Sequence, residues 1–173
     1  MTKRSIARVV AMGMFALAMV AGPMAVRAQG KTTVLQPGAL QELIPARVFY
    51  RGQTTTTQLR NSYGVKFSDG YYVLATLVDT SGYSNAVASK FEAYFITEVP
   101  IHVGGMRLGA GVYGIGFTAA NKFVVTDVGG HTVLTVNAAT DSAIKHPRPL
   151  EVLAQPGGRF RLYIGRRYVD LSR

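Results

Sequence analysis

Residues 104–117, GGMRLGAGVYGIGF, contain a literal G-x-G-x-x-G at positions 109–114, which is the glycine spacing of dinucleotide-binding loops. In those loops the glycines open a helix whose N-terminus faces the pyrophosphate. Here Gly116 and the β-branched pair at 124–125 follow the motif, and these residue types do not sustain a helix. We therefore interpret the glycines as turns and strand positions, and we expect no nucleotide cofactor and no other cofactor.

Five polar or aromatic side chains have the chemistry of a ligand-binding site: Tyr71, Asp79, Tyr83, Asp127 and His131. The two aspartates end or interrupt apolar strands, and the tyrosines offer stacking surfaces for a sugar or a peptide. Strand termination and half-buried tyrosines are the alternative interpretation of the same residues. The chain has no G-x-S-x-G and no histidine pair at metal-ligand spacing, and we assign no catalytic residue and no metal site.

A second candidate group is basic and lies near the end of the chain, at Arg159, Arg161, Arg166 and Arg167. On a strand, Arg159 and Arg161 share one face with Tyr163, while Phe160 and Leu162 occupy the other. This pattern predicts an anion-binding surface for lipid, polysaccharide or nucleic acid. A solvated strand face is the alternative interpretation.

These side chains would be positioned by strands, because the hydrophobic pattern mostly has period two. The sequence predicts about ten short strands, with turn signals every 8–12 residues. The predicted ranges are 46–51, 54–60, 63–67, 71–79, 91–99, 112–117, 122–128, 131–138, 150–155, 159–165 and 166–172. Residues 71–79 are almost continuously apolar, so we expect a central strand that is buried on both faces.

Two short helical turns interrupt the predicted strands. The first spans residues 37–44, with Leu40, Leu43 and Ile44 on one face. The second lies within residues 80–90, where Ser84-Asn85 would cap a short helix; a loop that crosses between layers is the alternative interpretation. The polar segment 140–149 is expected to be a connection with one helical turn. In the strand at 112–117, glycines alternate with large side chains, which leaves one strand face bare for the close approach of a neighbour.

The fold class expected from this pattern is all-β: an antiparallel β-sandwich, or a partly open barrel, of short hairpin-linked strands. Its domain would comprise residues 29–173, because residues 1–28 have the pattern of a signal peptide. Cations are followed by an apolar run at 9–22, shorter than the ~20 residues of a spanning helix, and by a cleavage site after Ala28. Subtracting the four leader cations from the formal net charge of +10 leaves +6.

The segment 99–128, VPIHVGGMRLGAGVYGIGFTAANKFVVTDV, resembles a hairpin of uncharacterised exported bacterial proteins such as those of acidobacteria. The shared features are a glycine turn, a leucine, x-x-Gly-x-Tyr and an apolar strand. A closing strand similar to LYIGRRYV belongs to the same resemblance. The resemblance implies an exported β-domain of unknown function and brings no activity or catalytic residue with it.

From these patterns we expect a non-enzymatic binding or structural β-domain of the cell envelope, periplasmic or secreted after cleavage. One alternative is a small hydrolase or a small-ligand-binding β-barrel that uses the aspartates, histidines and tyrosines. Another is an anion-binding protein that acts through the arginine-rich strands. The expected partner is an anionic envelope component or another envelope protein.

Overall fold

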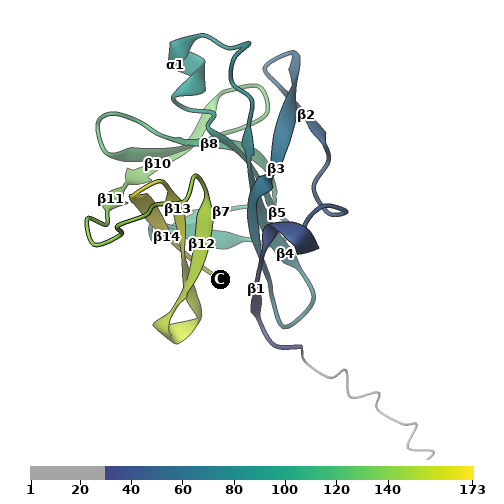
Figure 1. Ribbon diagram of the computed structural model, residues 1–173, viewed down its shortest axis with the longest axis vertical. Coiled ribbons are helices and arrows are strands. Elements are labelled where there is room, and N and C mark those ends of the chain that lie inside the picture. Colours follow the sequence, from purple (N-terminus) through teal and green to yellow (C-terminus); the bar gives the residue numbers. More distant parts are fainter. Residues whose placement is uncertain (1–29) are drawn as a thin grey trace, which may run out of the picture.

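The computed structural model describes residues 30–173, which form two antiparallel sheets packed face to face (Figure 1). The larger sheet has the strand order β1-β3-β4-β5-β8-β9-β10, with β2 also paired to β3. The smaller sheet has the order β12-β13-β14-β6-β7, with β11 also paired to β14. Neither sheet closes on itself, so the predicted antiparallel sandwich is confirmed and the barrel alternative is not. The predicted signal peptide at 1–28 lies outside the described residues.

The strands of the larger sheet are β1 (Thr33–Leu35), β2 (Arg47–Tyr50), β3 (Gln53–Lys66), β4 (Tyr72–Val78), β5 (Ala93–Thr97), β8 (Gly111–Phe117), β9 (Lys122–Thr126) and β10 (Thr132–Asn137). Those of the smaller sheet are β6 (Ile101–Val103), β7 (Met106–Leu108), β11 (Ala139–Thr140), β12 (Glu151–Gln155), β13 (Arg159–Ile164) and β14 (Arg167–Ser172). The helical segments are α1 (Asn85–Ala88), η1 (Pro37–Ala39) and η2 (Pro156–Gly158). The predicted helical turn within 140–149 is absent from the described chain, where β11 and turns occupy the segment.

The main core lies between the sheets and is built from alternate residues of each strand. In β13, Phe160 and Leu162 are buried in it, while Arg159 is exposed, as the period-two pattern predicts. β4 is buried on both faces and lies between β3 and β5, which confirms the predicted central strand.

Two smaller clusters cover the outer face of the larger sheet, and they explain why β4 is so apolar. Leu40 and Ile44 pack on Leu74 of β4, so the turn at 37–44 does face the sheet. Leu43 is 40% exposed and does not join them, because the chain leaves the 3-10 turn before a full helical face forms. The second cluster contains Val48, Tyr50, Val78 and Phe91; we call it the outer aromatic cluster.

The prediction of two strands at 54–60 and 63–67 is wrong, because both belong to the 14-residue strand β3. Its pairing with β4 shifts register between Thr57 and Ser62, which marks a bulge where the sequence suggested a break. Before the bulge, β3 pairs with β2. β2 and α1 gather at one end of the molecule (Figure 1). The β2–β3 hairpin contacts the turn between β9 and β10 there, where the Arg51 N–H donates to the Val128 carbonyl at 2.8 Å.

The bare face of β8 is occupied as the glycine pattern predicts. A Cβ on Gly114 would lie 2.7 Å from the Tyr50 ring, and one on Gly116 would lie 2.8 Å from the Ser89 carbonyl oxygen. The segment after α1 therefore crosses directly over β8. This crossing also places Phe91 in the outer aromatic cluster rather than on the core face of β5, because the strand begins only at Ala93.

Within residues 30–173, no helix has the length and apolar character needed to cross a membrane.

Candidate functional site

Basic side chains lie in a row across the outer face of the smaller sheet. Strand pairing places Ser172 of β14 opposite His102 of β6, and His102 opposite Arg107 of β7. Phe160 of β13 is buried, so the preceding Arg159 lies on the outer face next to Ser172. With strands about 4.8 Å apart, the row from β13 to β7 extends over roughly 14 Å. We call Arg159, His102 and Arg107 the basic row.

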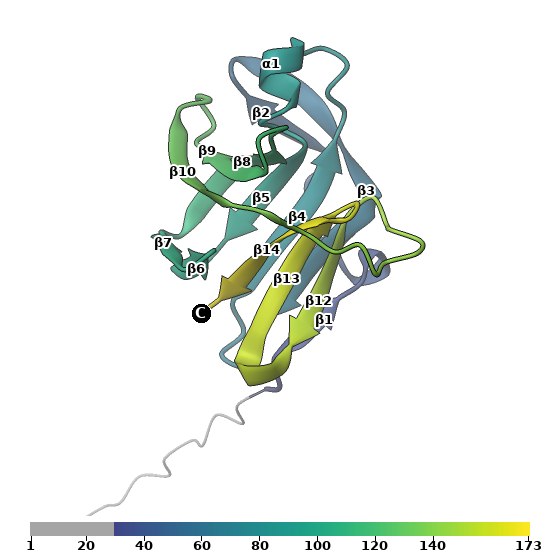
Figure 2. The same ribbon diagram turned by 90° about the vertical axis from the view of Figure 1, so that its left-hand side faces the viewer.

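The basic row is exposed to solvent and carries no acidic residue. None of its three side chains belongs to an ion pair among residues 30–173. Figure 2 shows the smaller sheet on the near side, in front of the larger sheet. An arginine keeps its charge at any physiological pH, so two fixed positive charges flank the imidazole on this face.

A groove of about 410 Å³ adjoins the row where the edge of β14 passes from one partner strand to another. β6 pairs with residues 171–172 of β14, whereas β11 pairs with residues 167–168. The lining of the groove includes Gly104, Gly105, Asn137, Arg159, Tyr168 and Asp170. The volume falls in the range of about 300–1,000 Å³ that is typical of ligand sites.

The Gly104-Gly105 turn builds one wall of this groove. Both residues have positive φ, at 55° and 85°, as the tight turn between β6 and β7 requires. A Cβ on Gly104 would lie 2.9 Å from Val136 Cγ2 of β10. Glycine at this position therefore lets the β6–β7 hairpin approach the edge strand of the larger sheet.

The predicted arginines do not form one surface. Arg161 lies on the outer face, but its Nε donates to Asp170 Oδ1 at 2.9 Å and its guanidinium lies 4.4 Å from the centre of the Tyr168 ring. Arg166 donates to the carbonyl oxygens of Ile144 and Lys145 and fastens the connection before β12. Of the four, Arg159 lines the groove and joins the basic row.

Arg167 connects the two sheets instead of facing an anion in solvent. Its Nη1 donates to the Phe117 carbonyl at 2.6 Å, and its Nη2 lies 3.1 Å from Glu92 Oε1. The other Glu92 oxygen accepts the Phe117 N–H at 2.8 Å. Both charged side chains are less than one-third exposed, so this pair is part of the sandwich's packing.

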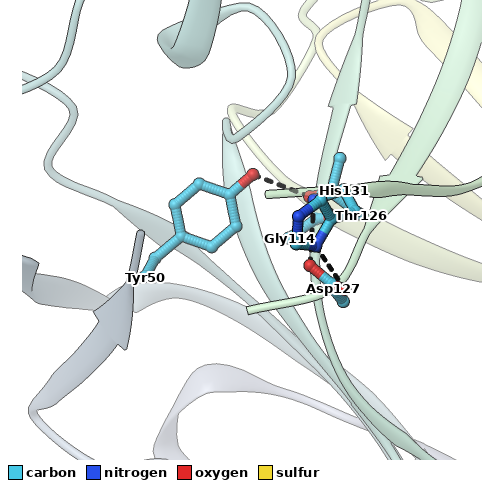
Figure 3. A network of polar contacts seen from close by, with 5 residues as sticks. All are labelled: Tyr50, Gly114, Thr126, Asp127 and His131. Carbon is cyan, nitrogen blue, oxygen red and sulfur yellow. Dashed lines mark hydrogen bonds and ion pairs between the residues drawn. The ribbon is translucent and has the colours of Figure 1, made fainter. Parts of the chain in front are cut away.

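Asp127 and His131 come together at the tight turn between β9 and β10 (Figure 3). Asp127 Oδ1 accepts the His131 N–H at 2.9 Å, and Oδ2 lies 3.0 Å from His131 Nδ1. The neighbouring Thr126 is buried and pairs with the Tyr50 hydroxyl at 2.8 Å. The histidine side chain is 84% exposed, so the pair lies on the surface of a turn that it also stabilises.

This turn predicts a pH dependence of stability. The His131 backbone N–H, followed by its side chain, holds the pKa of Asp127 below its ordinary value. Because the pKa is lower in the folded state, the ionised carboxylate stabilises the fold at pH values above the ordinary aspartate pKa of about 3.9. This contribution is lost as the pH falls through the pKa of Asp127 in the folded protein. We expect the melting temperature of Asp127→Asn to fall less than that of the wild type as the pH is lowered into the acid range. Identical acid profiles in a thermal melt series would contradict the assignment.

The remaining candidates lie in separate places. Asp79 and Tyr83 line one depression of about 200 Å³ at the end of β4. Tyr71 precedes the other end of that seven-residue strand, roughly 26 Å from Asp79. β5 and β8 lie between β4 and β9, which separates the strands of Asp79 and Asp127 by roughly 14 Å, and the pairing registers also offset the two residues along the strands. The five predicted ligand residues therefore do not converge on one cleft.

The contribution of His102 and Arg107 to the basic row was not predicted from the sequence. His102 lies between the buried Ile101 and Val103, which is a detectable outward-facing signal, whereas Arg107 has a buried neighbour only in Leu108. Their alignment with Arg159, however, depends on β6 pairing with β14, about 70 residues later in the chain. Among the described residues, no group of three or more His, Cys, Asp or Glu side chains is arranged to hold a metal ion.

No protein-family model, curated protein or solved structure matches this chain.

Proposed function

We propose that the protein is an exported, non-enzymatic binding domain that holds an anionic component of the cell envelope on its smaller sheet. The basic row of Arg159, His102 and Arg107 is the observation that carries this proposal. Guanidinium groups presented at fixed spacing by paired strands suit successive phosphate or carboxylate groups of a polymer. The positive net charge adds longer-range attraction to such a partner.

The adjoining groove supports binding rather than catalysis. Its carboxylate, Asp170, is engaged by Arg161, and the same guanidinium lies over the Tyr168 ring. These contacts fix the side chains that border the groove. Arg159, whose Nε donates to the Pro156 carbonyl at 3.4 Å, belongs to no ion pair among residues 30–173 and is the lining cation left for a ligand. A site of this kind selects a ligand by charge and shape and offers it no free acid–base pair.

The leader sequence supports a location outside the cytoplasm. In this proposal the signal peptide is cleaved near Ala28, and residues 29–173 act in the periplasm or are secreted. The chain contains no cysteine, so its stability in that oxidising compartment depends on the packed sandwich and not on disulfides.

The proposal predicts salt-sensitive retention on an anionic polysaccharide matrix. We expect the double variant Arg107→Gln, Arg159→Gln to elute at lower salt than the wild type. Each contact between a cation and a polyanion contributes about one unit to the slope of log K against log salt, so the slope should fall by about two. Affinity chromatography on heparin-agarose over a salt series measures both quantities.

The matched control is Lys31→Gln, Arg60→Gln, which removes the same net charge from exposed positions outside the row. We expect its salt slope to stay close to that of the wild type. Equal losses in the two double variants would show that net charge alone causes retention, and the proposed site would then be wrong. Retention that does not depend on salt would have the same consequence.

A further inference from the structure

The depression at the end of β4 is a second polar site, distinct from the groove. Its volume is about 200 Å³, and its lining includes Arg47, Thr54, Thr56, Asp79, Ser81 and Tyr83. It shares no lining residue with the groove beside the basic row. Since ligand sites usually measure about 300–1,000 Å³, this one suits a ligand smaller than a typical drug molecule.

The two charged residues of the depression flank a hydroxyl group. Arg47 of β2 is paired with Thr56 of β3, and the Asp79 N–H donates to the Thr56 carbonyl on the other side at 3.0 Å. Two strand spacings separate the chain segments of Arg47 and Asp79, roughly 10 Å. Neither residue belongs to an ion pair among residues 30–173. A positive and a negative group thus border the same small space without neutralising each other.

The surrounding contacts hold the acidic side of the site in place. Asp79 Oδ1 accepts the Ser81 N–H at 3.0 Å, which fixes the carboxylate in a turn. That hydrogen bond is the main reason that the pKa of Asp79 lies below its ordinary value, so the group is ionised at neutral pH. The Tyr83 hydroxyl donates to the Tyr50 carbonyl at 3.1 Å, which fixes the tyrosine as a wall.

The opposite face of the hairpin is closed by packing. Thr55 is buried, and its hydroxyl donates to the Asp79 carbonyl. Thr54 and Thr56 alternate with it and are exposed, so their hydroxyls belong to the face of the hairpin that also carries Arg47. The depression therefore combines hydroxyl groups with one carboxylate and one guanidinium.

The geometry points to a binding site for a small zwitterion, an amino acid or a dipeptide. Its ammonium group would pair with Asp79 and its carboxylate with Arg47, with the threonine hydroxyls between them. This ligand class does not depend on the anionic partner proposed above, and the two sites can be tested with separate variants.

Titration of the protein with L-alanyl-L-alanine, followed by ¹H–¹⁵N NMR spectra, tests the inference. We expect saturable shift changes at residues 53–56 and 79–83. N-acetylation of the peptide removes the ammonium charge, and amidation removes the carboxylate. Each modification should weaken binding about tenfold or more, which corresponds to about 1.4 kcal/mol. Free alanine, as a third probe, distinguishes an amino acid site from a dipeptide site.

Two variants assign the charges to their partners. Asp79→Asn keeps an oxygen for the Ser81 N–H. We expect this variant to bind the acetylated peptide and the free peptide with equal affinity. Arg47→Gln should no longer distinguish the free peptide from the amide, while Arg60→Gln, on β3 outside the depression, should behave as the wild type. Equal affinity of the wild type for all three peptides would overturn the inference. The absence of chemical-shift changes at a peptide concentration of about 10 mM, which is ten times a Kd of about 1 mM, would also overturn it.

Discussion

Replacing Tyr50 by alanine is expected to lower the free energy of unfolding by about 3–5 kcal/mol, the usual cost of removing a large buried aromatic side chain. Tyr50 is 1% exposed at the centre of the outer aromatic cluster. Its ring stacks on Phe91 with centroids 3.7 Å apart and meets Tyr83 edge-on at 6.0 Å. Without the ring, the β2–β3 hairpin loses its main attachment to the outer face of the larger sheet. Urea denaturation followed by circular dichroism measures the loss.

Two companion variants separate the contributions of Tyr50. Tyr50→Phe removes only the hydroxyl group paired with Thr126, and we expect it to cost about 1 kcal/mol. The adjacent Phe49 is 56% exposed on the opposite face of the same strand, so Phe49→Ala should change stability by less than about 0.5 kcal/mol. If Tyr50→Ala were no more damaging than Phe49→Ala, the outer aromatic cluster would not hold the hairpin.

Substituting alanine for Gly116 is expected to destabilise the protein by about 2–3 kcal/mol, because it overpacks a closed contact. The added Cβ would lie 2.8 Å from both the Ser89 carbonyl oxygen and the Lys90 carbonyl carbon. These are backbone atoms, so the segment after α1 would have to move away from β8. At an ordinary strand position, replacing glycine by alanine stabilises a protein by roughly 0.5–1 kcal/mol. The predicted change at Gly116 therefore has the opposite sign to the usual one.

Gly38 provides the control for this substitution. A Cβ there would meet no heavy atom within 4 Å, and we expect Gly38→Ala to leave stability unchanged within about 0.5 kcal/mol. The urea midpoints of the two alanine variants give the comparison. A Gly116→Ala protein as stable as the wild type would mean that the crossing segment does not approach β8 as closely as described.

The period-two pattern and the turn residues predicted most strands and the sandwich because both are local signals. Alternation in β13, for example, separates buried Phe160 and Leu162 from exposed Arg159 without reference to any other strand. The error at β3 arose because Asn61 and Ser62 usually end a strand, whereas here Ser62 is fully buried and its hydroxyl pairs with Thr76 of β4 at 2.8 Å. Only the pairing partner reveals that these polar residues lie inside the sheet.

The candidate sites were less predictable because they depend on pairings between distant segments. Arg167 stands beside Arg166 in the sequence, but its contact with Glu92 joins residues 75 positions apart and turns a candidate anion ligand into a tie between sheets. Asp79 and Tyr83 are close in sequence and could be grouped in advance. Arg47, which completes their charge pattern, enters through the hairpin of β2 with β3.

The bulge in β3 separates the half of the strand that pairs with β2 from the half that forms the core of the larger sheet. From Thr57 to Ser62, β3 advances five residues while β4 advances only two, from Val78 to Thr76, so the extra residues absorb any mismatch between the two halves of the strand. Length changes in this segment would shift the hairpin over the sheet without inverting the inside–outside alternation of the core. A change at the bulge would therefore act on the small polar depression and on the outer aromatic cluster, and would leave the core between the two sheets in register.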